Sequence, residues 1–189
     1  MKAKGSFNVD MGMPDEAGIQ STKMTVKEPV ETKKTEEALA DSKILDTEIV
    51  ELQKYLGIAL SEDELWQILF GNTLEKRNIC IVPHKMYATF RTISMGDSNF
   101  IERQLGEIAD SKLLKRGFDN INTQYLLAAG MLELGKPGNA RSIGATIDER
   151  FKAIDGMSAF TVDLLSRKWT AYMNLVDKSL KRESYKGNS

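Results

Sequence analysis

The chain's only cysteine and only histidine, Cys80 and His84, lie four residues apart in the stretch "NICIVPHKMYATFRTISMGDSNFIERQL" (residues 78–105). A thiol and an imidazole can form a nucleophile and base pair, or supply two ligands to a zinc ion. The first needs a third group that orients the base, and the second needs three or four protein ligands. Pro83 also interrupts any helical geometry between them. We therefore predict a buried thiol beside a surface histidine, with no catalytic residue, no metal ligand and no cofactor.

The same stretch has the residue types of β-strands. The run "NICIVP" favours β-structure and stops at Pro83, while the alternation in "MYATFRTIS" places Met86, Ala88 and Phe90 on one face. Proline has no N–H group and fits the end of a strand or a sheet edge. We predict two short strands within residues 78–94, arranged as a hairpin or as a pair of edge strands.

Two helices are predicted before the strands, within residues 42–72. Apolar residues recur at helical spacing in "SKILDTEIVELQKYL", which ends at Gly57. In "SEDELWQILFGN", Ser61 and Glu64 have the spacing of a capping box, and Gly71 can end the helix in the left-handed conformation. This pair of helices can form a docking element or a small subdomain, but core packing is favoured. The side chains expected to be buried are Leu65, Trp66, Ile68, Leu69 and Phe70.

Residues 97–183 are predicted to form a helical bundle. Its first helix begins at Asp97 or Ser98, since either is a good N-cap. An apolar helix from Tyr125 to Leu134 follows and stops at the turn "GKPG". That turn contains Gly and Lys but lacks the pattern of a phosphate-binding loop.

Two further helices complete the predicted bundle. Thr146 and Glu149 again have capping-box spacing, and Gly156 ends that helix. The longest helix carries an apolar stripe that favours an intramolecular core over a coiled coil: Val162, Leu165, Trp169, Tyr172, Val176 and Leu180. The predicted fold class is therefore mainly α, a helical domain at residues 42–183 with a short two-stranded β element, a long extended N-terminal arm and a flexible tail at residues 184–189.

The predicted arm covers residues 1–41, which contain few large apolar groups among Gly, Pro, Thr, Lys and Glu. Such a segment buries too little apolar surface to offset its ordering entropy, so we expect it to be disordered alone. It is either a solvated tail or an arm that orders on a partner. The second interpretation assigns partner binding to spaced apolar anchors: Phe7, Val9, Met11, Met13, Ile19, Met24 and Val26.

Composition narrows the classes of partner. The 26 basic and 27 acidic side chains give a formal net charge of -1, which supplies no strong positive field to attract nucleic acid. The sequence has no apolar stretch long enough to span a membrane, and its N-terminus lacks the apolar run of a signal peptide. A single cysteine cannot form an internal disulfide, so we expect a protein that matures in a reducing cytoplasm.

The order of elements resembles that of the small assembly proteins of tailed-phage tails and baseplates. The resemblance is carried by "KMYATFRTISMGDSNFIERQL", "NTQYLLAAGMLEL" and "IDERFKAIDGMSAFTVDLLSRKW", within residues 85–169. It implies a tail-assembly chaperone or baseplate assembly protein that has no cofactor, binds other phage structural or assembly proteins, and works in the host cytoplasm during assembly. The arm and the extra helices at 44–70 depart from that pattern and leave room for a subunit retained in the virion.

Two other function classes stand beside this expectation. A cytoplasmic adaptor or regulator with a disordered arm shares the same features but binds a cellular partner. An enzyme would have to use carboxylates such as Glu102, Asp148 or Glu149, which helix surfaces and caps already explain. We therefore expect a protein without enzymatic activity.

The packing interpretation of Cys80 and His84 predicts unequal effects of substitution. Cys80→Ser should lower the free energy of unfolding by roughly 1 to 3 kcal/mol, because it places a hydroxyl in a buried site, and His84→Ala should change it little. Chemical denaturation of both variants measures this. Stoichiometric zinc in the purified protein, or a folded double variant without activity, would contradict the interpretation.

Overall fold

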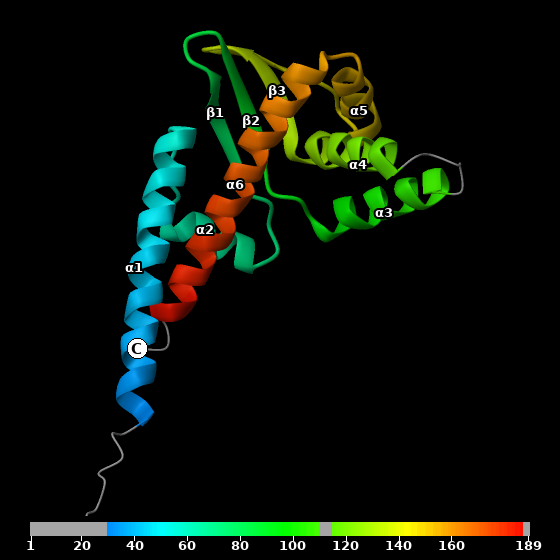
Figure 1. Cartoon of the computed structure of the whole chain (residues 1–189). Helices are drawn as coiled ribbons and strands as arrows, with labels where there is room; N and C mark the ends of the chain where they lie inside the picture. Colours follow the sequence, from blue (N-terminus) through cyan, green and yellow to red (C-terminus); the bar gives the residue numbers. More distant parts are fainter. Residues whose placement is uncertain (1–29, 110–114, 187–189) are drawn as a thin grey trace, which may run out of the picture.

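The computed structural model describes residues 30–109 and 115–186, which form six helices and one four-stranded sheet (Figure 1). The elements in chain order are α1 (Val30–Leu56), α2 (Glu62–Leu69), β1 (Glu75–Val82), β2 (Met86–Arg91), α3 (Met95–Ala109), α4 (Lys115–Gly130), β3 (Met131–Lys136), β4 (Asn139–Ser142), α5 (Ile147–Asp155) and α6 (Ala159–Lys186). The prediction of a mainly α chain is confirmed.

The sheet is an antiparallel meander in the order β1-β2-β3-β4. β1 and β2 form the predicted hairpin, and His84 in its turn has a φ of 59°. Asn78 has the same φ where the register shifts between Lys76 and Ile79, so β1 carries a bulge. α3 and α4 are inserted between β2 and β3, which nevertheless pair directly (Figure 1).

The prediction of a two-stranded element is wrong, because residues 131–142 form a second hairpin. α4 ends at Gly130, so the apolar run from Tyr125 to Leu134 is divided between a helix and a strand. The "GKPG" turn joins β3 to β4 instead of ending a helix, and residues 97–183 are not an all-helical bundle. Periodicity cannot assign so short an apolar run, and pairing with β2 decided it.

Gly130, the last residue of α4, contacts the indole of Trp169. A Cβ at Gly130 would lie 1.9 Å from Nε1 and 2.5 Å from Cε2 of that ring, so only glycine fits. Trp169 is 9% exposed, and its Nε1 has no hydrogen-bond partner within the described ranges. The missing side chain therefore lets α4 pack directly on α6.

Two arginines hold the carbonyl end of α4. Arg91 Nε donates to the carbonyl oxygen of Ala129 at 2.8 Å, and Arg150 Nε donates to that of Ala128 at 2.5 Å. Carbonyls in the last turn of a helix have no intrahelical donor, so these side chains satisfy groups that the change to β3 leaves open. Arg91 also forms a 2.8 Å ion pair with Asp97 of α3.

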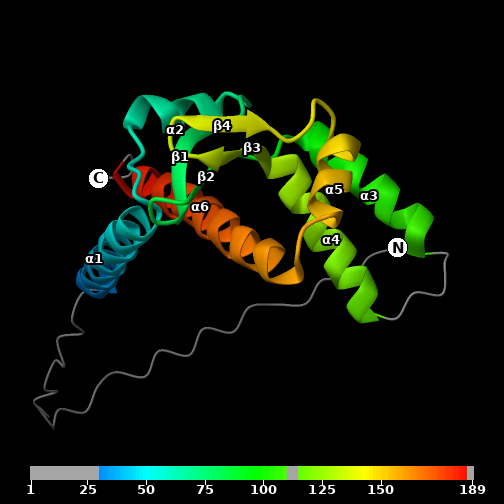
Figure 2. The same ribbon diagram turned by 90° about the horizontal axis from the view of Figure 1, so that it is seen from above.

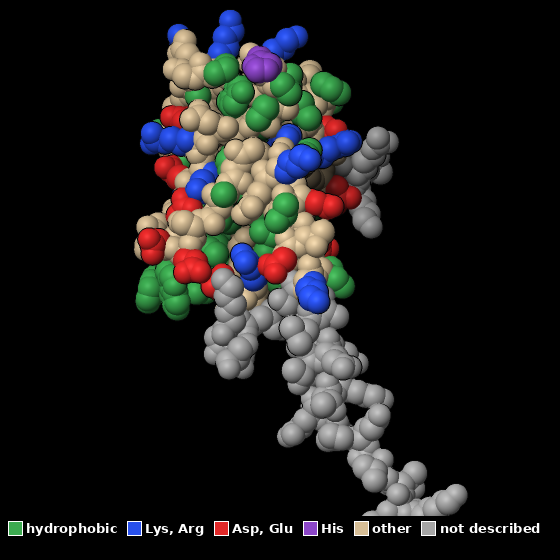
Figure 3. All heavy atoms as spheres, turned by 90° about the vertical axis from the view of Figure 1, so that its left-hand side faces the viewer, with side chains coloured by type: hydrophobic (Ala, Val, Ile, Leu, Met, Phe, Trp, Pro, Cys, Tyr) green, Lys and Arg blue, Asp and Glu red, His purple; other side chains and the backbone are tan. Residues whose placement is uncertain are grey.

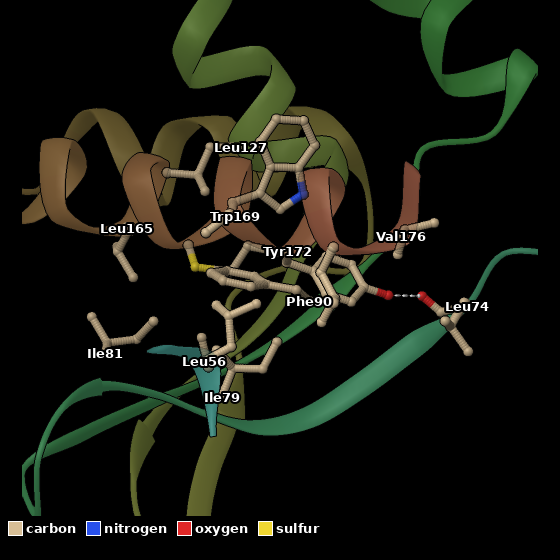
Figure 4. Close-up of a cluster of buried hydrophobic side chains, with 14 of the residues drawn as sticks. Leu56, Leu74, Ile79, Ile81, Phe90, Leu127, Leu165, Trp169, Tyr172 and Val176 are labelled. Carbon is tan, nitrogen blue, oxygen red and sulfur yellow. Dashed lines mark hydrogen bonds between the residues drawn. The ribbon is translucent and has the colours of Figure 1, made fainter. Parts of the chain in front are cut away.

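α6 lies against the sheet and supplies the centre of the core (Figures 2 and 4). The predicted stripe is buried within the subunit at Leu165, Trp169, Tyr172 and Val176. The Tyr172 hydroxyl donates to the carbonyl oxygen of Leu74 at 2.7 Å (Figure 4), and burial raises the pKa of this hydroxyl well above its ordinary value. The interpretation of the longest helix as a core helix is confirmed.

α1 runs antiparallel to α6 and packs along the C-terminal half of α6 (Figure 1). Asp46 forms a 2.7 Å ion pair with Arg182. Near the other end of α1, Lys168 Nζ donates to the carbonyl oxygen of Tyr55 at 2.8 Å and lies 3.5 Å from the centroid of its ring. Lys168 is buried, so this cation closes the C-terminal end of α1 from within the core.

The helix starts follow local capping chemistry. Both predicted capping boxes, at Ser61 and at Thr146, are present. The start expected for α3 at Asp97 or Ser98 is wrong, since the helix begins at Met95. Ser94 Oγ accepts from Asp97 N at 3.1 Å while Asp97 Oδ2 accepts from Ser94 N at 2.9 Å, so Asp97 acts as the third residue of a capping box.

The predicted ends of the domain lie partly outside the described residues. α1 begins at Val30, so helical backbone occupies the last part of the segment expected to be an arm. The apolar anchors at residues 7–26 lie outside the described ranges. α6 continues to Lys186, which places the start of the expected tail within that helix.

The Gly130 contact predicts a specific steric cost. Gly130→Ala should lower the free energy of unfolding by about 1 to 3 kcal/mol through overpacking against the Trp169 indole. Gly106→Ala is the matched control, because a Cβ there meets nothing within 4 Å, and this change should be neutral or stabilise α3 by up to about 1 kcal/mol. Urea denaturation measures both, and Trp169→Phe should partly rescue Gly130→Ala. Equal effects of the two glycine substitutions would contradict this assignment.

The surroundings of the Asp97 carboxylate predict that its contribution to the free energy of unfolding depends on pH. Burial alone would raise the pKa of this carboxyl, but hydrogen bonds from Ser94 and the Arg91 guanidinium hold it below the ordinary value of 3.8. The pKa of Asp97 is thus lower in the folded state than in the unfolded state. The carboxylate therefore stabilises the fold fully above the unfolded pKa, and this stabilisation is lost as the pH falls through the folded pKa.

Asp97→Asn should therefore cost about 1 to 3 kcal/mol at neutral pH, and the gap to the natural protein should close below about pH 4. Urea denaturation at a series of pH values measures the gap. Glu102→Gln, at an exposed position of the same helix, is the control and should change stability by less than about 0.5 kcal/mol. A gap that does not depend on pH would show that the charge of Asp97 is not what stabilises this junction.

Candidate protein-interaction surface

The short helix α2 exposes most of its large apolar side chains. Trp66 is 57% exposed, Leu69 is 59% exposed and Phe70, which follows the helix, is 78% exposed. Leu65 is the buried residue of this helix, and Ile68 packs partly against the core. The prediction of burial is therefore wrong for Trp66, Leu69 and Phe70, which we call the α2 face.

The reason lies in how α2 meets the rest of the molecule. The helix has eight residues, of which Leu65 is buried and Ile68 packs against the core. Residues three and four apart share a face of a helix, so Trp66, Leu69 and Phe70 form a second stripe next to the buried one. No described element covers that stripe. The sequence shows that the helix is apolar on two sides, but it does not show which of those sides packs against another element.

The aromatic part of the α2 face is ordered by internal contacts. The rings of Trp66 and Phe70 stack with centroids 6.2 Å apart and an interplanar angle of 28°. Phe70 N donates to the carbonyl oxygen of Trp66 at 3.1 Å, and Gly71 then turns the chain with a φ of 83°. The pair is thus fixed by backbone and ring contacts and presents a preformed surface.

The N-terminus of α2 is fixed as well. Ser61 and Glu64 form the capping box, and Glu64 also makes a 2.6 Å ion pair with Lys76 of β1. Burial would raise the pKa of the Glu64 carboxyl, but these partners lower it overall. The helix is therefore tied to the sheet at its start, and it also contacts α6.

Hollows lie on both sides of α2, where it meets the C-terminal half of α6. One has a volume of about 410 Å³ and is lined by Glu62, Leu65, Trp66, Leu69, Leu180, Glu183 and Ser184. We call it the α2/α6 groove. The other, of about 370 Å³, is lined in part by Ile68, Met173, Val176, Leu180 and the exposed side chain of Met95. Leu180 lines both hollows, which therefore adjoin in the region between α2 and α6, and the second hollow also has polar lining residues such as Asn72 and Asp177.

This region is at the end of the molecule where α6 finishes (Figures 1 and 2). Hydrophobic side chains gather at the lower left of the face in Figure 3, in the direction where Figures 1 and 2 place α2. Single exposed apolar residues are ordinary on protein surfaces, but a contiguous apolar patch is typical of an interaction site.

Cys80 and His84 occupy different parts of the first hairpin. Cys80 is half-buried within β1 and pairs with Tyr87, whereas His84 is exposed in the turn (Figure 3). The described hydrogen bonds include none between them. Across residues 30–109 and 115–186, no group of three His, Cys, Asp or Glu residues is placed to hold a metal ion.

The carboxylates considered for catalysis have structural surroundings. Glu149 Oε2 accepts from the backbone N–H of Ala145 at 2.7 Å and of Thr146 at 3.3 Å, so it caps α5. Asp148 lies in the first turn of the same helix, and Glu102 is exposed on α3. These three side chains therefore have the capping and surface positions that the sequence predicts.

A cleft of about 270 Å³, which the sequence did not predict, lies over the sheet and is lined by residues from all four strands. Thr89 Oγ1 donates to Glu133 Oε2 at 2.6 Å within it. Arg150, which borders the cleft, directs Nη1 to the carbonyl oxygens of Gly144 and Ala145. Arg150 thus donates to backbone carbonyls near the end of α4 and the start of α5. We therefore assign this part of the cleft a structural role.

Comparison with known proteins adds no relative. No family model matches the chain, and no curated protein or solved structure does either. Among the helices of the described ranges, none has the length and apolar character needed to cross a membrane.

Proposed function

We propose that this protein works through protein–protein contacts, as a morphogenesis or structural subunit of a tailed phage in its tail, baseplate or connector region. The observation that carries the contact part of the proposal is the α2 face, where Trp66, Leu69 and Phe70 are exposed and the first two line the α2/α6 groove. The phage part rests on the resemblance of residues 85–169 to tail and baseplate assembly proteins.

The composition of the α2 face supports a binding role. Trp is among the residue types that dominate binding energy at interfaces, and aromatic side chains in general are enriched there. The α2/α6 groove, which Trp66 and Leu69 help to line, offers space for apolar side chains of a partner. Because α2 is held by its capping box and by the Glu64–Lys76 ion pair, little ordering entropy is spent when a partner binds.

A cellular adaptor remains the second candidate, since the same face can bind a host protein. The identity of the bound protein separates the two functions. Stoichiometric recovery with phage tail or baseplate proteins supports the first, and recovery with a single cellular protein supports the second. A gene located away from phage structural genes would also count against the phage assignment.

The α2 face predicts a loss of association without a loss of folding. The double variant Trp66→Ser, Phe70→Ser should reduce recovery of the tagged protein with its assembly by at least about tenfold, since hot-spot truncations cost about 2 kcal/mol or more each. Affinity purification from cells that produce the assembly, with quantitative mass spectrometry, measures recovery. The free energy of unfolding should change by less than about 1 kcal/mol, because both side chains are exposed.

Phe160→Ser is the matched control. Phe160 is 76% exposed, close to the value for Phe70, but it lies at the opposite end of α6 from the groove. This variant should associate normally. A double variant that associates as well as the natural protein, or a control that fails equally, would remove the α2 face from the proposal.

A further inference from the structure

We infer that the free edge of β4 is a second binding site, which takes an extended acidic segment of a partner protein as a fifth strand of the sheet. The site lies apart from the α2 face, so it goes beyond the proposed function and does not depend on which assembly the protein joins. Two features point to it: the backbone groups that β4 turns outward, and the unpaired cations around them.

β4 is one of two edge strands, and it is the open one. The order β1-β2-β3-β4 leaves one unpaired side on β1 and one on β4. β1 carries the bulge at Asn78 and contacts α1, and both features discourage further pairing. The principal contacts of β4 are with β3 and β2, and Figure 2 shows β4 on the side of the sheet away from α6. Among the described residues, no strand pairs with its outer side.

The register of the second hairpin shows which backbone groups face outward. Ile143 N donates to the carbonyl oxygen of Leu132 at 3.1 Å, so these two residues form a hydrogen-bonded pair. Bonded and non-bonded pairs alternate along an antiparallel ladder, and the non-bonded positions of β4 are therefore Ala140 and Ser142. Their N–H and C=O groups point away from β3, and none of the hydrogen bonds among the described residues uses these groups.

The two hairpins differ in charge from the rest of the chain. Residues 76–96 and 134–147 contain no Asp or Glu, although the whole chain has 27. Lys76 and Arg91 form ion pairs with acids of α2 and α3. The exposed cations of these segments that have no ion pair within the described ranges are Arg77, Lys85, Lys136 and Arg141.

These cations surround β4. Because Tyr87 pairs with Gly135, the turns of both hairpins lie at one end of the sheet, with Lys85 in one turn and Lys136 beside the other. Arg141 is on β4 itself. Figure 3 shows Lys and Arg side chains gathered with the histidine at the top of the molecule. An extended chain that carries carboxylates is therefore attracted to β4 by charge as well as by backbone hydrogen bonds.

A second copy of this chain is a poorer occupant of the edge. Two β4 strands that pair antiparallel and bond at both Ala140 and Ser142 must place Arg141 directly opposite Arg141 of the other copy. Like charges directly opposite each other in a sheet are destabilising, whereas an acidic residue opposite Arg141 stabilises the pair. The edge thus disfavours self-association and selects an acidic strand.

A synthetic peptide of about eight residues that alternates Glu with Thr or Val tests the site, because it is long enough to form a strand. It is titrated into the ¹⁵N-labelled full-length protein at low salt. Amide hydrogen exchange of Ala140 and Ser142 should slow on binding, while that of Arg141, which already bonds to β3, should change little. The same peptide with Gln in place of Glu should bind at least about tenfold more weakly.

Substitutions on the protein test the charge and the backbone separately. The double variant Lys136→Glu, Arg141→Glu should weaken binding at least about tenfold and should instead bind a peptide with Lys in place of Glu. Lys43→Glu, Lys54→Glu is the matched control on α1, at the other edge of the sheet, and should bind normally. Ala140→Pro removes an outward N–H, which a sheet edge tolerates, and should abolish binding without unfolding the protein.

Peptide binding that leaves the exchange of Ala140 and Ser142 unchanged would overturn the inference, as would equal binding of the Glu and Gln peptides. A single-stranded oligonucleotide that binds these cations more tightly than the peptide does would overturn it in favour of nucleic acid. These outcomes are distinct from failure of the proposed function, which is read from recovery of Trp66→Ser, Phe70→Ser with the assembly.

Discussion

The close approach of α4 to α6 at Gly130 is the constraint on which the rest of the fold depends. With no side chain at that residue, the indole of Trp169 lies against the helix backbone, and α4 can end there and continue directly as β3. The indole N–H is left without an acceptor within the described ranges, which has an energetic cost that the surrounding burial offsets. The junction leads directly into residues 131–136, which pair with β2.

Buried and half-buried cations bind the carbonyl ends of α4 and α1. Arg91 and Arg150 bind the last carbonyls of α4, and Lys168 binds a carbonyl near the end of α1. Each contact joins segments far apart in the sequence, so the ends of these helices are satisfied by tertiary packing and not by neighbouring residues. Burial lowers the pKa of Lys168, with only partial relief from Cys80, which indicates how far this charge is removed from solvent.

The same packing leaves α2 with a single covered side. α6 is occupied by α1 on one flank and by the sheet and α4 along its length, and α2 meets only its C-terminal half (Figures 1 and 2). A helix of eight residues cannot bury two apolar stripes against one neighbour. The α2 face is therefore a consequence of the fold.

The sequence by itself determined the features that depend on neighbouring residues. Capping boxes at Ser61 and Thr146, the β1–β2 hairpin and the stripe on α6 followed from local spacing, because their partners lie within a few residues or on one helix face. Only the tertiary structure decided that residues 131–136 pair with β2 and that residues 139–142 pair with them in turn, since a short apolar run suits helix or strand equally. It also decided that Trp66 and Phe70 face outward, because apolarity predicts burial only where another element is present to provide it.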